Sequence, residues 1–214
     1  MITIYGRPDS SAVARVMWTI GELGLEHQRI DWGGAFGGND AAEYREMCPS
    51  GKIPAVRLED DETLWESNAI IRYLCARDPK NRFLAANPLE RAKTEAWMDW
   101  SGALQTAVSR IRKTYKPADA SQAEIDKTLE QVAPTFLILN RRLEGQNFVM
   151  GHDLSAADFA LGVWAHRLWR CPAVAKPDGI NAIWMWLERL QSRPAYKEHV
   201  MAKVSAGPQS VGGG

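Results

Sequence analysis

The residues with the clearest chemical potential surround Pro54, which lies between a turn and an apolar run. Residues 49–52 (PSGK) have the composition of a turn, and residues 55–58 (AVRL) have that of a strand. Proline has no N–H to donate to a sheet, and X-Pro bonds are where cis peptides occur. If Ile53-Pro54 is cis, the backbone N–H and C=O of Ile53 are free to pair with an extended peptide ligand.

A second group, Glu66-Ser67-Asn68, stands where an apolar helical pattern begins. Free N–H groups at the start of a helix attract carboxylates, and the Ser67 hydroxyl adds a further donor. Together with the segment around Pro54, this group predicts a binding site for a small, peptide-like anion.

These motifs resemble those of the glutathione transferase superfamily. The resemblance rests on PSGKIP at residues 49–54 and LWESNAIIRYL at 64–74, and it continues through IYGR at 4–7, WMDW at 97–100 and LSAADF at 154–159. It is closest to bacterial, serine-type members of theta-, beta- or zeta-like character. It implies an α/β N-terminal thioredoxin-like domain joined to an all-α C-terminal helical domain, the glutathione transferase fold. It also implies a symmetric homodimer that uses glutathione as co-substrate, with a role in detoxification.

The resemblance makes Ser10 the first candidate for activating the glutathione thiol, with Ser11 second. An ordinary thiol has a pKa near 8.5 and is mostly protonated at pH 7, and each unit of lowering requires about 1.4 kcal/mol of thiolate stabilisation. A hydroxyl at the start of the first helix can donate a hydrogen bond to the sulfur, and the helix dipole adds to that effect. The alternative is that either serine only caps the helix.

The resemblance also implies roles for the residues around the anion site. Glu66 would bind the amino group of the γ-glutamyl end, Ser67 its carboxylate, and Lys52 the glycyl carboxylate. The alternatives are a helix start with favourable charge at Glu66 and Ser67, and a solvated side chain at Lys52. Cys48 replaces the asparagine commonly found before the proline in this family, and it is expected to be a small buried residue.

A pocket for an apolar second substrate is expected in the helical half, which contains most of the tryptophans. Trp100, Leu104 and Trp164 are the candidate walls, although aromatic residues at helical spacing usually pack in the core. Tyr5 ends the first strand and is a rival for thiol activation or a pocket wall. No metal site is expected, because His152 and His166 lack ligand-like spacing.

The composition excludes several other functional classes. Among 214 residues, 26 Lys and Arg balance 26 Asp and Glu, so no basic surplus is available for nucleic acid. The chain shows neither a leader nor a long apolar segment, which predicts a cytoplasmic protein with no membrane partner. Three separated cysteines (Cys48, Cys75, Cys171) form neither a disulfide framework nor a C-x-x-C pair, which disfavours a glutaredoxin-like oxidoreductase.

The pattern along the chain predicts two domains. Strand and helix signals in residues 1–78 follow the order βαβαββα, residues 79–87 form a polar linker, and residues 88–206 are helical throughout, with a flexible tail at 207–214. Asn87-Pro88 predicts the start of the first long helix. Pro134 interrupts a later apolar stripe and suggests two shorter helices instead of one.

The function predicted from these observations is that of a glutathione transferase, in which a bound thiolate attacks an electrophilic carbon. Two alternatives stay open. One is a glutathione or ligand carrier of the same fold without catalysis, and the other is a glutathione-dependent peroxidase or disulfide reductase.

Overall fold

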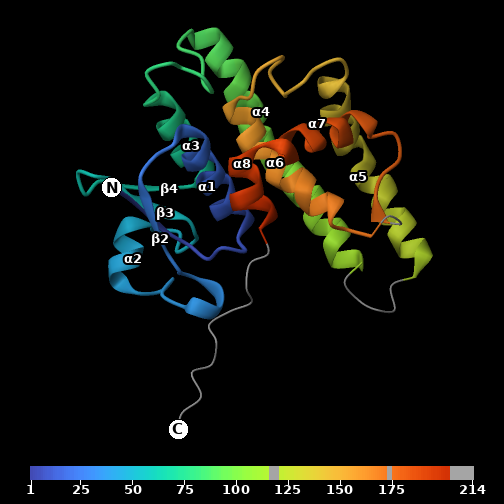
Figure 1. Ribbon diagram of the computed structural model, residues 1–214. Coiled ribbons are helices and arrows are strands. Elements are labelled where there is room, and N and C mark those ends of the chain that lie inside the picture. The colour runs from blue at the N-terminus through green and yellow to red at the C-terminus, as the bar shows by residue number, and fades with distance from the viewer. Residues whose placement is uncertain (116–120, 173–174, 203–214) are drawn as a thin grey trace.

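The protein is described by a computed structural model at residues 1–115, 121–172 and 175–202 (Figure 1). The first part of the chain follows the predicted order βαβαββα, which confirms that expectation. Its elements are β1 (Ile2–Tyr5), α1 (Ser11–Leu23), β2 (His27–Ile30), α2 (Ala42–Met47), β3 (Ala55–Arg57), β4 (Thr63–Trp65) and α3 (Ser67–Ala76), with a short 3-10 turn, η1, at Gly34–Phe36.

The four strands form one mixed sheet in the order β2-β1-β3-β4. β1 pairs with β2 in parallel, and β3 pairs antiparallel with both β1 and β4. Alternation along the strands gives the sheet two apolar faces. Ile2, Ile4 and Val56 face the main core, which includes α1 and α3, whereas Tyr5 and Ala55 belong to a smaller cluster with α2.

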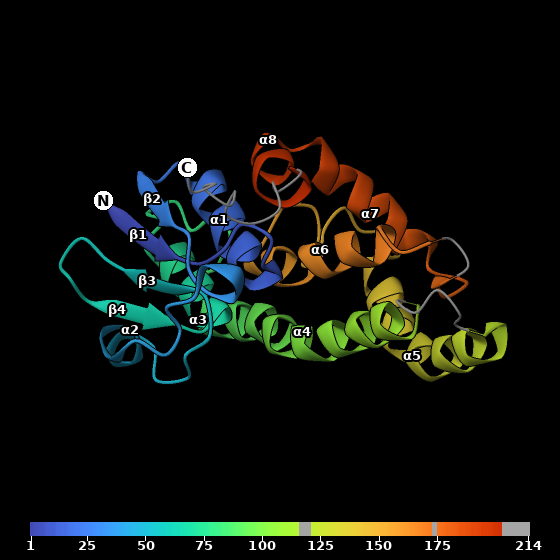
Figure 2. The same ribbon diagram turned by 90° about the horizontal axis from the view of Figure 1, so that it is seen from below.

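The second part is helical and lies beside the sheet domain (Figure 2). It contains α4 (Pro88–Tyr115), α5 (Gln122–Leu143), α6 (Ala156–Trp169), α7 (Asn181–Ser192), the short α8 (Pro194–Tyr196) and a π-helical turn, η3, at Lys197–Met201. The expectation of two shorter helices around Pro134 is wrong, because α5 continues through this residue. Buried residues on both sides of Pro134, Val132 and Phe136, hold the helix in the core and offset the cost of an interior proline.

Local capping explains where several helices begin and end. Asn87 Oδ1 accepts hydrogen bonds from the N–H groups of Leu89 and Glu90, as its position before Pro88 predicts. Gly24 ends α1 in a left-handed conformation with a φ of 69°. Ser155 and Asp158 form the predicted capping box at the start of α6.

Aromatic residues join the sheet domain to the helices. The ring of Trp18 on α1 meets Phe159 on α6 at 4.8 Å and Tyr196 on α8 at 4.7 Å, both edge to face. Arg193, at the junction of α7 and α8, donates to both carboxylate oxygens of Glu22 on α1 at 2.6 Å. The two parts therefore share one core.

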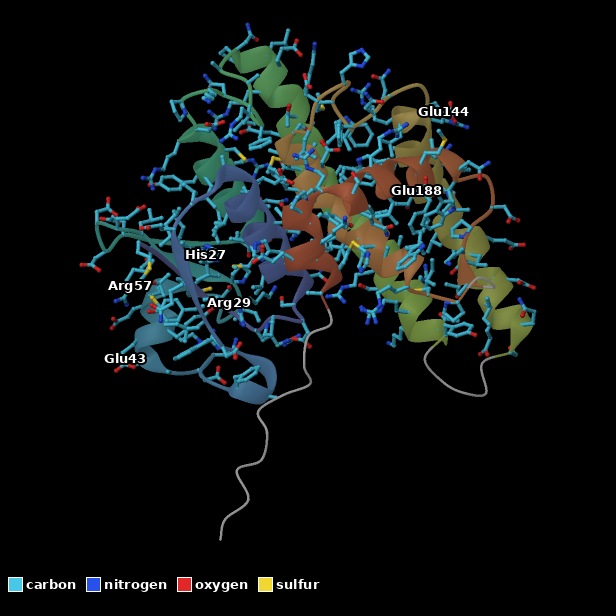
Figure 3. The ribbon with its side chains drawn as sticks, viewed as in Figure 1. His27, Arg29, Glu43, Arg57, Glu144 and Glu188 are labelled. Carbon is cyan, nitrogen blue, oxygen red and sulfur yellow. The ribbon has the colours of Figure 1, made fainter. Side chains whose placement is uncertain are left out.

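The limits of the sequence-based domains stay predictions, although α3 ends at Ala76 and α4 begins at Pro88. The predicted tail at 207–214 lies outside the described residues. Charged side chains such as Glu43 on α2 and Glu188 on α7 are exposed (Figure 3). In the described part of the chain, no helix combines the length and apolar character needed to cross a bilayer.

Candidate active site

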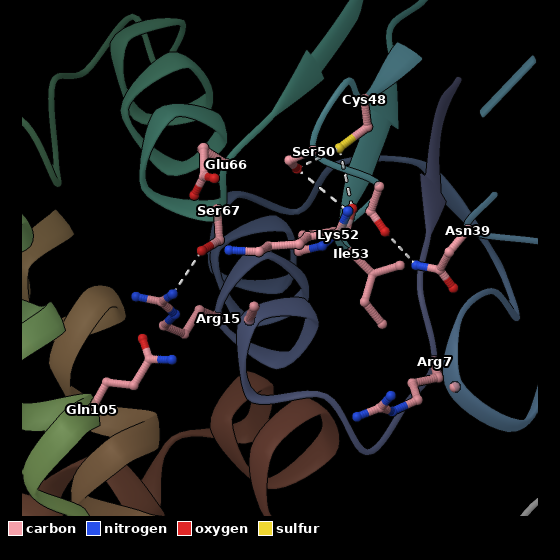
Figure 4. A pocket seen from close by; sticks show the side chains of 14 residues that line it. Arg7, Arg15, Asn39, Cys48, Ser50, Lys52, Ile53, Glu66, Ser67 and Gln105 are labelled. Carbon is pink, nitrogen blue, oxygen red and sulfur yellow. Dashed lines mark hydrogen bonds between the residues drawn. The ribbon is translucent and has the colours of Figure 1, made fainter. Parts of the chain in front are cut away.

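A cavity of about 420 Å³ opens where α1, the segment before β3, the start of α3 and α4 meet (Figure 4). Every residue predicted to bind glutathione lies on its wall: Lys52, Ile53, Pro54, Glu66 and Ser67. The remaining lining residues are Arg7, Ala12, Arg15, Gly34, Asn39, Cys48, Ser50, Gly51 and Gln105.

Hydrogen bonds from α2 and its flanking residues fix the turn before β3. The Tyr44 hydroxyl donates to the carbonyl of Lys52 at 2.8 Å, and the Cys48 thiol donates to the same oxygen at 3.2 Å. Asn39 Nδ2 donates to the carbonyl of Gly51 at 2.5 Å. The Ile53-Pro54 peptide is cis, and no hydrogen bond among the described residues uses the backbone N–H or C=O of Ile53. These backbone groups are therefore available to a ligand.

The opposite wall is the start of α3. Glu66 precedes the helix with a φ of 66°, a positive value that a non-glycine residue uncommonly adopts. This conformation turns the chain from β4 into α3. Ser67 is buried as the first helical residue, and the exposed Glu66 stands beside it at the cavity (Figure 4).

Arg15 on α1 is a site residue that sequence reasoning missed. Its guanidinium donates to Ser67 Oγ at 2.6 Å, to Asn68 Oδ1 at 3.1 Å and to the carbonyl of Ala160 at 3.3 Å. It lies over the ring of Trp164, 5.6 Å from the ring centre. Burial lowers the pKa of Arg15 to about 10, and the opposing charge of Glu66 acts in the other direction. The sequence did offer a signal for this role, because an arginine on the apolar face of a helix is unusual unless it has a partner.

Arg15 also has unused hydrogen-bonding capacity. Its Nε is buried and has no hydrogen-bond partner among the described residues, although the side chain lines the cavity. A buried donor without a partner is costly. A cation in this position, next to Ser67 and the N–H groups of α3, suits a carboxylate.

The two candidate activating serines occupy different surroundings. Ser10 is buried and caps α1, because its Oγ accepts from the N–H of Val13 at 3.4 Å. Ser11 Oγ accepts from Nε of Arg167 on α6 at 3.0 Å. Neither serine is among the residues lining the cavity, whereas the following residue, Ala12, is. A hydroxyl both donates and accepts, so capping leaves the proton of Ser10 free for another partner.

The residues predicted to wall the second-substrate pocket are not gathered at this cavity. Leu104 and Trp164 are buried in the main core, and Trp100 packs edge-on against Trp97 with ring centres 5.4 Å apart. Tyr5 packs edge-on against the stacked rings of Trp32 and Tyr44 on the other side of the sheet. Gln105, one position after Leu104, is the residue by which α4 reaches the cavity.

Histidine and acidic residues do not gather in the described ranges into any group of three or more that could hold a metal ion. His152 is exposed, and His166 is buried with its ring stacked on Trp169. Burial, aided by Arg167 and Arg170, lowers the pKa of His166 to about 4, so this ring is neutral at pH 7.

Comparison with known proteins places this geometry in a family. The family descriptions "Glutathione S-transferase, N-terminal domain" and "Glutathione S-transferase, C-terminal domain" match residues 9–77 and 122–189. Glutathione S-transferase GstB of Escherichia coli (strain K12) is 33% identical over 211 residues, covering 96% of this chain and 100% of that protein. The chain belongs to the glutathione S-transferase family of enzymes.

Two further relatives support this family assignment, and one of them is named for a different reaction. A theta class glutathione S-transferase from the citrus canker pathogen Xanthomonas axonopodis pv. citri, solved with glutathione bound, superposes with a TM-score of 0.81 and 32% identity, covering 95% of this chain and 99% of that one. The disulfide-bond oxidoreductase YfcG of Escherichia coli (strain K12) is 28% identical over 91% of this chain and 92% of its own. The predicted glutathione transferase fold is thereby confirmed.

Proposed function

We propose that this glutathione S-transferase binds glutathione in the 420 Å³ cavity and activates its thiol for attack on an electrophilic carbon. The observation that carries the proposal is the meeting of two unlike walls. A turn with unused backbone groups at Ile53 faces a helix N-terminus that holds Glu66 and the Ser67–Arg15 pair.

The two walls suit the two ends of glutathione. The exposed carboxylate of Glu66 would bind the α-amino group, while Ser67, its backbone N–H and Arg15 would bind the neighbouring carboxylate. The backbone of Ile53 would pair with the cysteinyl residue as a strand pairs with its neighbour. Lys52 is exposed and lines the same cavity from the turn before β3, where it would meet the glycyl carboxylate.

Ser10 remains the proposed thiol-activating residue, with Ser11 as its alternative. Ser10 Oγ already accepts from the first turn of α1, and its O–H would donate a hydrogen bond that stabilises the thiolate. In the reaction the thiol proton leaves to solvent, the sulfur–carbon bond forms and the leaving group departs with its electron pair. Ser11 is the weaker candidate, because its hydroxyl oxygen already accepts a hydrogen bond from Arg167 on α6.

The test is a pH titration of the thiolate absorbance of glutathione bound to the intact chain and to Ser10→Ala. We expect the bound thiol to have a pKa about one to two units below the free value near 8.5, and the variant to return it toward that value. The rate of conjugation at pH 6.5 should fall about tenfold or more in the variant. Ser11→Ala tests the alternative, because a thiol pKa that returns to the free value in this variant and not in Ser10→Ala would make Ser11 the activating residue.

Other outcomes favour the remaining readings. Tight binding with an unshifted thiol pKa would indicate a ligand carrier, and absence of binding would contradict the cavity assignment.

The relative named as a disulfide-bond oxidoreductase makes thiol–disulfide exchange the second candidate. Reduction of a mixed disulfide at a rate above that of conjugation would favour it. A homodimer is proposed from the family resemblance. A cytoplasmic location, with neither nucleic acid nor membrane as partner, is proposed from the charge balance and the sequence pattern.

A further inference from the structure

A second cavity, of about 560 Å³, lies where the C-terminal ends of α4 and α6 come together. Figure 1 shows both helix ends at the same end of the molecule as the loop between β1 and α1. Its lining residues are Ser109, Arg112, Lys113 and Tyr115 from α4, and Arg170, Cys171 and Pro172 after α6.

The charge of this cavity has one sign. Arg112, Lys113 and Arg170 are exposed cations, and no carboxylate is among the lining residues. Across the described ranges, none of the three has an ion-pair partner within 4.0 Å. The neighbouring Arg167 lies near the same cations: burial lowers its pKa, the charges of Arg112 and Arg170 lower it further, and the carboxylate of Asp9 acts in the opposite direction. The remaining wall consists of Ser109, Tyr115, Cys171 and Pro172, and only Ser109 and the Tyr115 hydroxyl add polar side-chain groups to it.

The two cavities lie along one face of α4. Gln105 lines the first cavity, and Ser109 and Arg112, four and seven positions later, line the second. At about 1.5 Å per residue, Arg112 is about 10 Å along the helix from Gln105. The start of α1 contacts α6 through Arg167, which lies three residues before Arg170 and donates to Ser11 Oγ and to the carbonyl of Asp9. A substituted benzyl group is shorter than this separation, and the long, flexible side chain of Arg112 covers the remainder.

We propose that the second substrate is an electrophile with an anionic group, such as a carboxylate, held by Arg112, Lys113 and Arg170 while its reactive carbon faces the glutathione sulfur. This inference rests on the proposed function and replaces the largely apolar second substrate expected from the sequence with an amphiphilic one. Tyr115 and Pro172 cover the apolar body, and the cations bind the anionic end.

A simpler explanation is that cations at helix C-termini only complement the helix dipole. That effect requires no cavity and no convergence between helices. Here residues from two different helix ends line the same hollow, while Arg110 on the same turn of α4 is exposed and does not line it. Arg110 therefore serves as the matched control, because it shares the dipole contribution but not the cavity.

The test compares 4-(chloromethyl)benzoate with the neutral 4-(chloromethyl)benzamide as electrophiles. Both react through the same carbon, where the sulfur–carbon bond forms and chloride leaves with the bonding electrons. We expect kcat/KM for the carboxylate to exceed that for the amide by about tenfold after correction for their uncatalysed rates. Titration calorimetry with the two corresponding S-benzylglutathione conjugates should show the same preference in Kd, decreasing as salt is added.

In Arg112→Gln and Arg170→Gln the preference should fall toward equality, and in Arg110→Gln it should stay. Equal treatment of carboxylate and amide by the intact chain, or an undiminished preference in both cavity variants, would overturn the proposal. Turnover of the amide reports on the proposed function separately. If neither electrophile reacts, the proposed function fails. In that case a tighter Kd for the carboxylate conjugate than for the amide conjugate still supports the anion site. Equal Kd values, or no binding of either conjugate, overturn the anion site.

Discussion

At the scale of the residue, Arg15 links the ligand cavity to the core. It is one of few buried charges, and its three acceptors come from α3 and α6. A lysine at this position would keep the charge but lose the planar fork that reaches several acceptors together. Arg15 is therefore best described as a positioning residue for Ser67 that also supplies charge to the cavity.

For Arg15→Lys we expect the Kd for glutathione to rise about tenfold, because Ser67 loses a donor at 2.6 Å and the carboxylate loses a neighbour. Calorimetric titration measures the change. Arg77→Ala removes an exposed arginine at the end of α3, which pairs with Glu59, and should leave the Kd unchanged. An unaltered Kd in Arg15→Lys would remove Arg15 from the binding site.

His166 makes stability depend on pH. Its pKa in the folded chain is about 4, against 6.5 for an ordinary histidine, because burial and two neighbouring arginines oppose its charge. Between these values the unfolded chain binds a proton that the folded chain does not, so stability falls as the pH drops from 6.5 toward 4.

We expect the free energy of unfolding to fall by about 2 kcal/mol between pH 7 and pH 5 through this residue. Urea unfolding at both pH values measures the total, and His166→Phe isolates the contribution of His166 because phenylalanine does not titrate. The variant should show a smaller difference between the two pH values. An equal difference in both proteins would mean that other groups cause the dependence.

At the scale of the element, the start of α6 organises the helical domain. Asp158 accepts from the N–H and Oγ of Ser155, from the N–H of Val149 and from Nε1 of Trp186 on α7. One fully buried carboxylate thus joins the helix cap, the preceding loop and a neighbouring helix. All its partners are donors, which an aspartate without a proton satisfies best.

Asp158→Asn places an NH2 group against these donors, and we expect it to cost at least about 3 kcal/mol of unfolding free energy. Chemical denaturation followed by circular dichroism gives the value. Asp153→Asn, an exposed change in the same loop, should cost well under 1 kcal/mol. A similar loss in the two variants would show that the network around Asp158 contributes little.

At the scale of the whole molecule, the two domains pack closely against each other around a glycine, Gly162 on α6. A Cβ at Gly162 on α6 would lie 2.7 Å from Leu190 Cδ1 and 3.0 Å from Trp18 Cζ3, so α1, α6 and α7 approach one another only because this side chain is absent. Tyr196 donates to the carbonyl of the same residue at 3.0 Å. Packing at this point therefore involves both domains together.

Gly162→Val should lower the free energy of unfolding by about 1–3 kcal/mol through overpacking. Because the contact is shared, we expect tryptophan fluorescence and circular dichroism to report a single transition that moves as a unit. Gly102→Ala on α4, where a Cβ meets open space, is the control and should be neutral or slightly stabilising. Two separated transitions in the valine variant would contradict a shared core.

The sequence by itself determined the features that depend on local patterns. Alternating apolar residues, the Asn87-Pro88 start and the Ser155–Asp158 box act over a few neighbouring positions, so they can be read along the chain. The segments around Pro54 and Ser67 are likewise local motifs, and both line the cavity. The break predicted at Pro134 does not occur, because tertiary packing offsets the cost of a proline inside a helix.

Only the tertiary structure decided which distant residues meet. Arg15 reaches Ser67 across 52 positions, and Arg112 shares a cavity with Arg170 although no spacing rule connects them. Side-chain orientation on a helix also changes by about 100° from one residue to the next, so the cavity receives Gln105 and the core receives Leu104. Contacts between such distant residues depend on how the helices pack, and helix packing is determined by residues throughout the core.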